Sequence, residues 1–211
     1  MKRGAIILCG GQSSRMGTPK WSLPFGPETM LARVMRLVGA VCEPLVIVRA
    51  AGQVLPEFGD EIIITQDTRP NRGPLEGIAA GLAALPDDVD AAYVTSCDAP
   101  LVVGAAIERL FELLGDNSAA VPAQRGFVYP LSAIYRRGLV ELVRTLLDAD
   151  RLRPSDLFDL VPTRRVSSQE LIDVDPRLDT LRNLNTPEEY LEALGQAGYQ
   201  APPDILAQMR R

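Results

Sequence analysis

Short apolar runs of strand length recur along the chain, with helical patterns between several of them. The apolar runs cover residues 5–9, 44–48, 61–65, 91–95 and 119–121. The helical patterns, in which apolar side chains repeat at steps of three and four, cover residues 30–41, 75–85, 107–114 and 139–147. Strands that are apolar on both faces and alternate with amphipathic helices favour a parallel sheet covered on each side. We therefore expect an α/β fold, a single-domain Rossmann-like three-layer αβα sandwich with a mostly parallel sheet.

The length of 211 residues suits one large domain, which we expect over residues 1–197. Residues 151–179 are weak in periodicity and rich in Pro and charge, so they predict an irregular segment that shapes a ligand pocket, not a further strand–helix unit. Residues 198–211 contain Pro202 and Pro203 and end in two arginines. We expect this C-terminal tail to be mobile in part.

Composition and charge exclude several classes of protein. The net charge of −5 and the pI of about 4.9 disfavour a surface for nucleic acid or for an anionic membrane, because clustered Lys and Arg hold phosphate polymers. The sequence contains no His, which excludes the usual zinc sites and every triad that depends on imidazole. No stretch approaches the ~18 apolar residues of a membrane span. The apolar run after Lys2 and Arg3 is too short for a signal peptide and predicts a first strand.

The three cysteines, Cys9, Cys42 and Cys97, are widely spaced and indicate neither a disulfide framework nor a CxxC site. This usage is typical of a reducing compartment, so we expect the protein in the cytoplasm. We interpret Cys9 and Cys97 as small buried hydrophobic residues and not as nucleophiles, because no His is available to activate them.

The loop after the first apolar run is the strongest candidate for a phosphate site, since ligands of parallel sheets bind at the carboxyl ends of strands. It combines the glycines Gly10 and Gly11 with serines, Arg15 and Lys20. Glycine lets main-chain amides approach phosphate oxygens, while Arg15 and Lys20 supply positive charge for a polyphosphate. The loop matches neither GxxxxGK[ST] nor GxGxxG. We interpret it as a triphosphate cradle; the alternative is an ordinary Gly/Ser turn.

Asp98 is the best candidate for a metal ligand. It follows the apolar run 91–95 and lies next to Ala99 and Pro100, at the expected carboxyl end of a buried strand. A carboxylate at that place suits Mg²⁺, which takes one or two carboxylates together with phosphate oxygens and water. The alternative is that Asp98 caps a helix that begins near Pro100.

Two further segments carry weaker signals. Residues 67–77 join a strand to a helix, and Gly73 and Gly77 would let the main chain approach a planar base and its ribose, although an ordinary turn and helix start fits equally. In residues 183–189, Thr186 with Glu189 predicts a capping box and Pro187 the first helical position. Asn183 and Asn185 precede the box, where strand-like alternation would turn both carboxamides towards a metal–phosphate group.

These motifs together resemble the molybdenum cofactor guanylyltransferases. Residues 8–17, LCGGQSSRMG, with Lys20 resemble the signature LAGGxSxRMGxxK of that family. The segment 73–77, GPLEG, is similar to its GPLAG, the segment 97–100, CDAP, to its CDxP, and the segment 183–189, NLNTPEE, to its NxNTPEE. The resemblance covers residues 4 to about 195.

The resemblance implies transfer of GMP from GTP to molybdopterin that carries molybdenum, with Mg²⁺ as cofactor and release of pyrophosphate. It implies contacts with a molybdopterin-delivering protein and with recipient molybdoenzymes; the charge and the lack of a long apolar stretch predict no nucleic-acid or membrane partner. The implied catalytic residues are Arg15, Lys20 and Asp98, the last as the Mg²⁺ ligand. The implied nucleotide-binding residues are Leu8, Cys9, Gly10, Gly11, Ser13, Lys20, Asp67, Gly73, Pro74, Leu75, Gly77 and Asp98, and Asn183 and Asn185 lie near the acceptor or the metal.

The chain departs from the family at two places. Arg49 ends the second apolar run where the family often has Asn, and Tyr129 stands where a His often precedes Pro. Two alternatives stay open: a cytidylyltransferase that acts on the same pterin or on a sugar alcohol phosphate, and a non-catalytic nucleotide-binding regulator. The presence of Arg15, Lys20 and Asp98 together disfavours the regulator.

Overall fold

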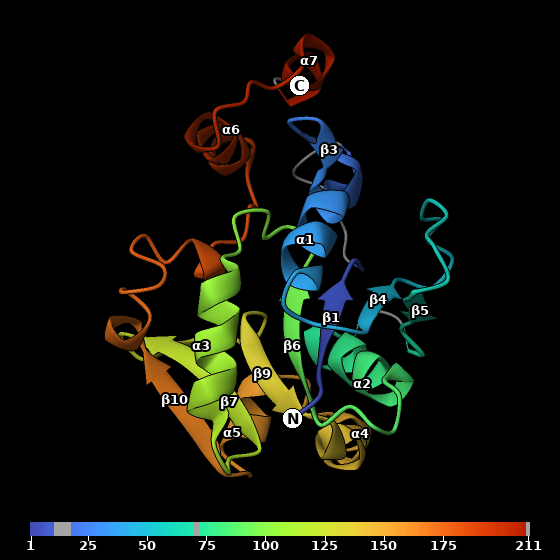
Figure 1. Cartoon of the computed structure of the whole chain (residues 1–211). Coiled ribbons are helices and arrows are strands. Elements are labelled where there is room, and N and C mark those ends of the chain that lie inside the picture. The colour runs from blue at the N-terminus through green and yellow to red at the C-terminus, as the bar shows by residue number, and fades with distance from the viewer. Residues whose placement is uncertain (11–17, 70–71, 210–211) are drawn as a thin grey trace.

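A central sheet with helices on both faces forms the body of the protein, seen in a computed structural model that describes residues 1–10, 18–69 and 72–209 (Figure 1). Its strands follow the order β10-β7-β9-β6-β1-β4-β5, and β8 pairs with β7. The strands are β1 (Arg3–Leu8), β4 (Leu45–Arg49), β5 (Ile62–Gln66), β6 (Ala91–Ser96), β7 (Ala119–Gln124), β8 (Phe127–Val128), β9 (Ala133–Arg136) and β10 (Thr163–Ser167). Strand β9 runs antiparallel to β6 and β7, whereas β1 with its neighbours, β4 with β5, and β7 with β10 are parallel. The predicted mostly parallel sheet is confirmed.

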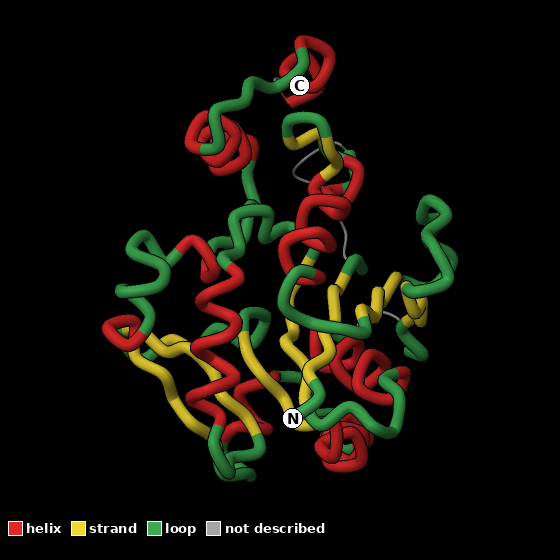
Figure 2. Tube along the Cα trace, in the orientation of Figure 1, coloured by secondary structure: helices red, strands yellow, loops and turns green. Residues whose placement is uncertain are grey.

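Two layers of helices cover the sheet, and alternate residues of β1 show why. Ile6 packs into a cluster with side chains of α2, α4 and α5, whereas Ile7 packs into a second cluster with α1 and α3. Successive side chains of a strand point to opposite faces, so the apolar residues 5–8 of β1 need a cover on both sides. The helices are α1 (Met30–Gly39), α2 (Pro74–Ala84), α3 (Gly104–Leu114), α4 (Val140–Asp148), α5 (Pro154–Phe158), α6 (Pro187–Gln196) and α7 (Pro203–Met209). The predicted three-layer sandwich is confirmed (Figure 2).

Local signals in the sequence set the helix ends. The Thr29 hydroxyl accepts a hydrogen bond from the Ala32 main-chain N at 3.2 Å and so caps α1. Helix α3 ends at Leu114 and is followed by Gly115, which has a φ of 51°. Helix α6 begins with the predicted capping box of Thr186 and Glu189. The structure thus confirms the helices predicted around residues 30–41 and 107–114, and the predicted capping box.

The prediction for residues 151–179 was wrong. This segment contains α5 and the edge strand β10, which pairs in parallel with β7. Within β10, Val166 is buried while the other positions are exposed or half-buried, because an edge strand faces solvent on much of its surface. The strand therefore lacks the continuous apolar run that marks the central strands.

The C-terminal residues pack against the short hairpin of β2 (Pro24–Phe25) and β3 (Glu28–Thr29). The ring of Tyr199 meets that of Phe25 edge-on at a centroid distance of 6.2 Å, and Ile205 of α7 is buried in the same cluster. Residues 198–209 are thus folded onto the domain, while their partial mobility and the boundary at residue 197 stay predictions.

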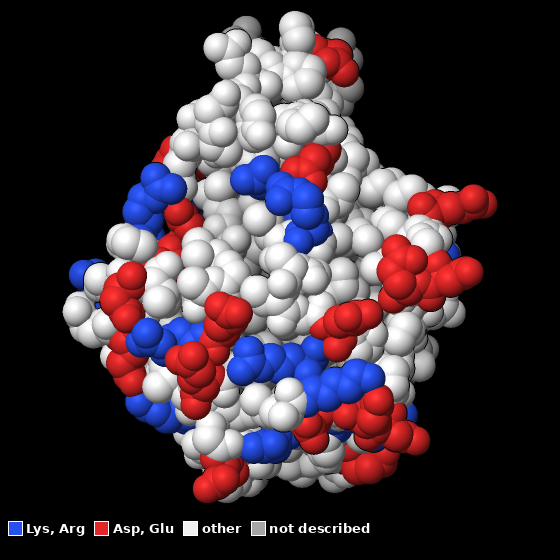
Figure 3. Space-filling model, viewed as in Figure 1, with Lys and Arg blue, Asp and Glu red and all other residues white. Residues whose placement is uncertain are grey.

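The surface carries mixed charge. On the face shown in Figure 3, acidic and basic side chains lie close together over the lower part of the molecule, whereas much of the upper part is uncharged. In the parts of the chain that the structure describes, no helix is long and apolar enough to cross a membrane.

Candidate active site

A cleft of about 780 Å³ opens at the carboxyl ends of β1, β4, β5 and β6. Strand register creates it: Leu8 at the end of β1 pairs with Val48 of β4 and with Ser96 of β6, so the loops that follow these strands emerge side by side. The volume lies within the range of small-molecule sites, which is roughly 300–1,000 Å³. Among the sequence-predicted residues, the cleft is lined by Leu8, Cys9, Gly10, Lys20, Asp67, Gly73, Pro74, Gly77, Asp98, Asn183 and Asn185.

A polar cluster of Lys20, Ser96, Asp98, Asn183 and Asn185 occupies the centre of the cleft, and we call it the Lys20–Asp98 cluster. Lys20 Nζ donates to Asp98 Oδ2 at 2.6 Å and to Asn185 Oδ1 at 2.8 Å. Asn183 Nδ2 donates to Asp98 Oδ1 at 2.9 Å, and the Ser96 hydroxyl donates to the same oxygen. Three segments that lie far apart in the sequence therefore meet at one carboxylate.

The structure assigns no helix-capping role to Asp98. Helix α3 begins at Gly104, and its N-cap is Val103, so the alternative interpretation of Asp98 as a cap is wrong. The main-chain carbonyl of Asp98 accepts a hydrogen bond from the Leu184 N at 2.8 Å, which ties the loop after β6 to the segment that carries both asparagines. The residue lines the cleft and is 9% exposed.

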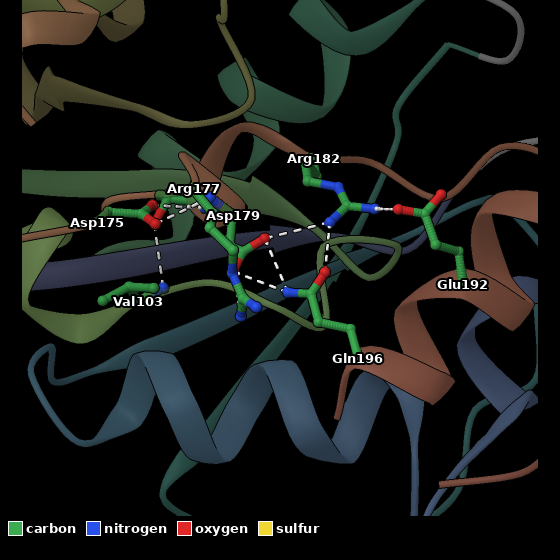
Figure 4. Close-up of polar contacts among 8 residues, drawn as sticks. Val103, Asp175, Arg177, Asp179, Arg182, Glu192 and Gln196 are labelled. Carbon is green, nitrogen blue, oxygen red and sulfur yellow. Dashed lines mark hydrogen bonds and ion pairs between the residues drawn. The ribbon is translucent and has the colours of Figure 1, made fainter. Parts of the chain in front are cut away.

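A second, buried carboxylate holds the asparagine segment from its N-terminal side. Figure 4 shows Arg177, Arg182 and Gln196 converging on Asp179, which is 5% exposed. Arg182 Nη1 lies 3.2 Å from Asp179 Oδ1, and Gln196 Nε2 donates to both Asp179 oxygens at 3.0 and 2.9 Å. Because Gln196 belongs to α6 and Arg182 immediately precedes Asn183, this network fixes the segment relative to the last turn of α6.

A neighbouring carboxylate, Asp175, fixes the turn that contains Asp179. Its two oxygens accept the main-chain N–H groups of Asp179 and Thr180 at 2.9 and 2.8 Å. The Thr180 hydroxyl in turn accepts from the Val103 N at 3.1 Å, which links the turn to the start of α3. Sequence reasoning missed this network, because nothing local in residues 175–182 indicates that their partners lie on α3 and α6.

The capping box of α6 holds the segment from its C-terminal side. Glu189 Oε2 accepts the main-chain N–H groups of Asn185 at 2.6 Å and of Thr186 at 3.0 Å, while the Thr186 hydroxyl accepts from the Glu189 N at 3.2 Å. The box therefore orders the main chain of Asn185 as well as the helix start. The predicted structural role of Thr186 and Glu189 is confirmed. The side chain of Asn183 contacts Asp98, whereas that of Asn185 contacts Lys20.

We expect Glu189→Ala to weaken substrate turnover as well as the helix cap. Loss of the cap should cost about 0.5–2 kcal/mol of unfolding free energy. Release of the Asn185 main chain should lower kcat/KM by about tenfold, which corresponds to ~1.4 kcal/mol. The matched control is Glu188→Ala, since Glu188 is exposed at the adjacent position. Equal kcat/KM values for the two variants in steady-state assays, with only the melting temperature differing, would contradict the positioning role.

Asp67 forms the opposite wall of the cleft between two glycines. A Cβ atom at Gly10 would lie 3.3 Å from Asp67 Oδ2, and one at Gly77 would lie 3.4 Å from Asp67 Oδ1 and 3.0 Å from Leu8 Cδ2. The two glycines therefore leave the carboxylate and the Leu8 side chain open to a flat ligand. Burial, and secondarily the charge of Glu76, raises the pKa of Asp67 above its usual value.

Two buried cysteines are among the residues that line the cleft. Cys9 and Cys97 are 5% and 7% exposed. A hydrogen bond with Cys97, followed by burial, raises the pKa of the Cys9 thiol well above its usual value. Since the thiolate is the nucleophilic form, this environment disfavours Cys9 as a nucleophile.

Some predicted residues lie elsewhere. Leu75 is fully buried in the core cluster beneath α2 and is not among the residues that line the cleft, so its side chain cannot contact a nucleotide there. Tyr129 also lies off the cleft lining, and its hydroxyl lies 3.4 Å from Gln124 Oε1. The predicted residues Gly11, Ser13 and Arg15 fall outside the part of the chain that the structure describes.

Gln53 is a cleft residue that sequence reasoning missed. Its carboxamide accepts from the Ala50 N at 2.9 Å and donates to the Cys9 carbonyl at 3.2 Å, so it joins the turn after β4 to the glycine loop. Arg49, which stands where the resembling family often has Asn, donates to the Gln53 carbonyl at 3.0 Å and does not line the cleft. A Gln four residues beyond a strand gives no local signal, so only the folded turn reveals it.

The Lys20–Asp98 cluster fits a magnesium ion. Among the residues that the structure describes, no group of three or more Cys, Asp or Glu is arranged to hold a metal by itself. Asp98 instead offers one carboxylate, and Asn185 Oδ1 lies close enough to share a cation with it, as their common contact with Lys20 Nζ demonstrates. One carboxylate and a neutral oxygen suit Mg²⁺, which obtains its remaining ligands from phosphates and water.

Comparison with known proteins agrees with this geometry. The family model of the MobA-like NTP transferase domain matches residues 5–159. A molybdenum cofactor guanylyltransferase of Desulfosudis oleivorans is 32% identical over 190 residues, which cover 89% of this chain and 92% of that protein.

Two solved structures share the fold at low sequence identity. Molybdopterin-guanine dinucleotide biosynthesis protein A from Archaeoglobus fulgidus superposes with a TM-score of 0.76 at 19% identity, over 94% of this chain and 99% of that one. The 2-C-methyl-D-erythritol 4-phosphate cytidylyltransferase from Thermus thermophilus gives a TM-score of 0.69 at 16% identity, over 94% and 100% of the two chains. The family match over residues 5–159 and the relative that aligns along most of its length lead to one conclusion: the chain belongs to the MobA-like NTP transferase family and is a nucleotidyltransferase.

Proposed function

We propose that the protein transfers GMP from GTP to molybdenum-loaded molybdopterin, which yields the guanine dinucleotide form of the cofactor and pyrophosphate. The observation that carries the proposal is the contact of Lys20 with Asp98 and Asn185 at the centre of the cleft. These three residues belong to three separate sequence motifs that resemble the guanylyltransferases, and the fold joins them at one point. The named relative from Desulfosudis oleivorans supports the same activity.

The reaction requires positioning and charge neutralisation more than proton transfer. The terminal phosphate of the pterin attacks the α-phosphorus of GTP, a new P–O bond forms, and the bond from the α-phosphorus to the bridging oxygen breaks as pyrophosphate leaves. A phosphate monoester is already anionic, so no His is needed as a base. Lys20 supplies a fixed positive charge next to the phosphates, and the main-chain amides that begin at Gly10 bind their oxygens.

Asp98 is the proposed ligand of Mg²⁺, with the amide oxygen of Asn185 beside it. When bound, the ion neutralises charge on the phosphates of GTP. Asn183 holds Asp98 Oδ1 at 2.9 Å and so orients the carboxylate towards the cleft. The buried Asp179 network keeps the asparagine segment in this position.

The wall formed by Leu8, Asp67 and Gly77 is the proposed site for guanosine. Its carboxylate can accept the two N–H donors on the Watson–Crick edge of guanine, an edge that cytosine does not present. The glycines allow the flat ring to lie close to the main chain. The opposite part of the cleft, near Asn183 and Asn185, is then left for the pterin acceptor.

The cellular setting follows from the substrates. We place the enzyme in the cytoplasm, in keeping with its buried free cysteines Cys9, Cys42 and Cys97. A molybdopterin-delivering protein and recipient molybdoenzymes are its proposed protein partners.

Pyrophosphate release tests the proposed function. With Mg²⁺ and molybdenum-loaded molybdopterin, we expect purified protein to consume GTP about 10- to 100-fold faster than CTP, because a site that hydrogen-bonds a base edge discriminates by roughly 1–3 kcal/mol per bidentate contact. Reactions without the pterin serve as the control for plain hydrolysis. Equal turnover of GTP and CTP would remove the base assignment, and a preference for CTP with a sugar alcohol phosphate would favour the cytidylyltransferase alternative.

A further inference from the structure

The side chain of Lys20 binds the same two oxygens that the proposed function assigns to the metal. Its Nζ lies 2.6 Å from Asp98 Oδ2 and 2.8 Å from Asn185 Oδ1. The other oxygen of Asp98 accepts from Asn183 and Ser96, so both carboxylate oxygens have partners. A second cation therefore cannot approach Asp98 Oδ2 and Asn185 Oδ1 together unless Lys20 moves away.

The ion pair is shielded enough for this competition to matter. The side chains of Lys20 and Asp98 are 18% and 12% exposed. By contrast, the ion pair of Lys2 with Asp88 has side chains that are 48% and 66% exposed, where solvent weakens the attraction. Two cations close to one carboxylate repel each other more strongly in the cleft than at such a surface site.

Charge balance indicates when Lys20 can leave. The Lys20–Asp98 cluster contains one carboxylate and one ammonium group, so it is neutral by itself. A divalent cation added alone would leave two positive charges uncompensated, whereas the triphosphate of a nucleotide brings several negative charges. Lysine carries its charge on a flexible four-carbon stem, so its ammonium group can turn from Asp98 to a phosphate oxygen.

Resting on the proposed metal role of Asp98, we propose that Lys20 is the resident cation of the metal site and leaves it when nucleotide binds. In the nucleotide-free protein, Lys20 neutralises Asp98 and excludes divalent ions. When a nucleoside triphosphate binds, Lys20 transfers its contact to the phosphates and frees Asp98 Oδ2 and Asn185 Oδ1. Metal and nucleotide affinities are then coupled, and each ligand raises the affinity of the other by the same factor.

The decisive experiment measures metal binding without nucleotide and without catalysis. Mn²⁺ is titrated into the full chain, and the free ion is followed by electron paramagnetic resonance. We expect wild type to bind Mn²⁺ weakly and Lys20→Met to bind it at least about tenfold more tightly, since the competing charge is gone. Lys20→Arg keeps the charge and should bind as weakly as wild type. Lys2→Met is the matched control, because it removes an exposed lysine that forms an ion pair away from the cleft.

The Mn²⁺ titrations of these variants distinguish a failure of this inference from a failure of the proposed function. Mn²⁺ binding that is equally weak in Lys20→Met and wild type, or equally tight, would overturn the exchange while leaving the guanylyltransferase proposal intact. Asp98→Asn should abolish the tight binding gained by Lys20→Met when the two substitutions are combined. If the double variant keeps that binding, the metal does not use Asp98 and the assignment of this residue is wrong. Circular dichroism spectra of each variant establish that the chain is folded.

Discussion

Asp98→Ala should lower the rate of dinucleotide formation by about a thousandfold while the protein stays folded. A bound metal stabilises transition-state charge by several kcal/mol, and each ~1.36 kcal/mol corresponds to a factor of ten in rate. The alanine removes the carboxylate that contacts Lys20, Asn183 and Ser96, all of which lie at the open cleft and not in the apolar core. The rate is read from pyrophosphate release, and folding from the far-ultraviolet circular dichroism spectrum.

Two companion variants make the Asp98 result specific. Asp98→Asn keeps the shape and part of the hydrogen bonding but loses the charge, so it should be nearly as inactive as the alanine variant. Asp88→Ala removes an exposed carboxylate that also contacts a lysine, and it should keep full activity. Activity in Asp98→Ala within tenfold of wild type would show that Asp98 is not the metal ligand.

Asp67→Asn should stabilise the folded protein at neutral pH and at the same time remove the preference for guanine. Burial, with a smaller contribution from Glu76, raises the pKa of Asp67 in the folded state. A carboxyl group with a raised folded-state pKa favours folding as the pH falls through that pKa, and its ionised form opposes folding above it. Asparagine removes the buried charge, so the melting temperature at neutral pH should rise. The ratio of kcat/KM for GTP over CTP should fall by about 10- to 100-fold.

The pH dependence of GTP binding tests the role of Asp67 independently. Only the ionised carboxylate accepts both N–H donors of guanine, so wild-type affinity for GTP should fall as the pH is lowered through the raised pKa of Asp67. Binding is followed by fluorescence of Trp21, which lines the cleft and is the single Trp of the sequence. The Asp67→Asn variant should show no such fall. A parallel pH dependence in the two proteins would assign the titration to another group.

The sequence was sufficient for those parts of the fold that depend on local signals. The all-apolar strand around Ile6 and Ile7, the Thr29 cap and the capping box of Thr186 each involve residues within a few positions of one another. Strand β9 was missed because it is a four-residue strand that enters the sheet between β6 and β7. Its place is set by partners far away in the sequence on β6, as in the pairing of Ala92 with Tyr135.

The candidate site likewise contains some residues that the sequence could indicate and others that it could not. Asp98 and Lys20 could be predicted because their residue types are unusual at strand ends, where chemistry is expected. The sequence could not indicate that Lys20 contacts Asn185, since 165 positions separate them. Gln53 and Asp179 gave no signal for a related reason: each is an ordinary polar residue until the fold supplies its distant partners.

The apolar cluster that Leu23, Leu184 and Ile205 share explains how such distant segments meet. Leu23 follows Lys20 closely, and Leu184 lies between the two asparagines, so this cluster fastens the segments that carry both partners of the central contact. Lys20 is therefore synthesised 165 positions before Asn185, and the cleft can be complete only after the later segment has left the ribosome. The nascent protein should stay inactive until the segment that carries both asparagines has been released.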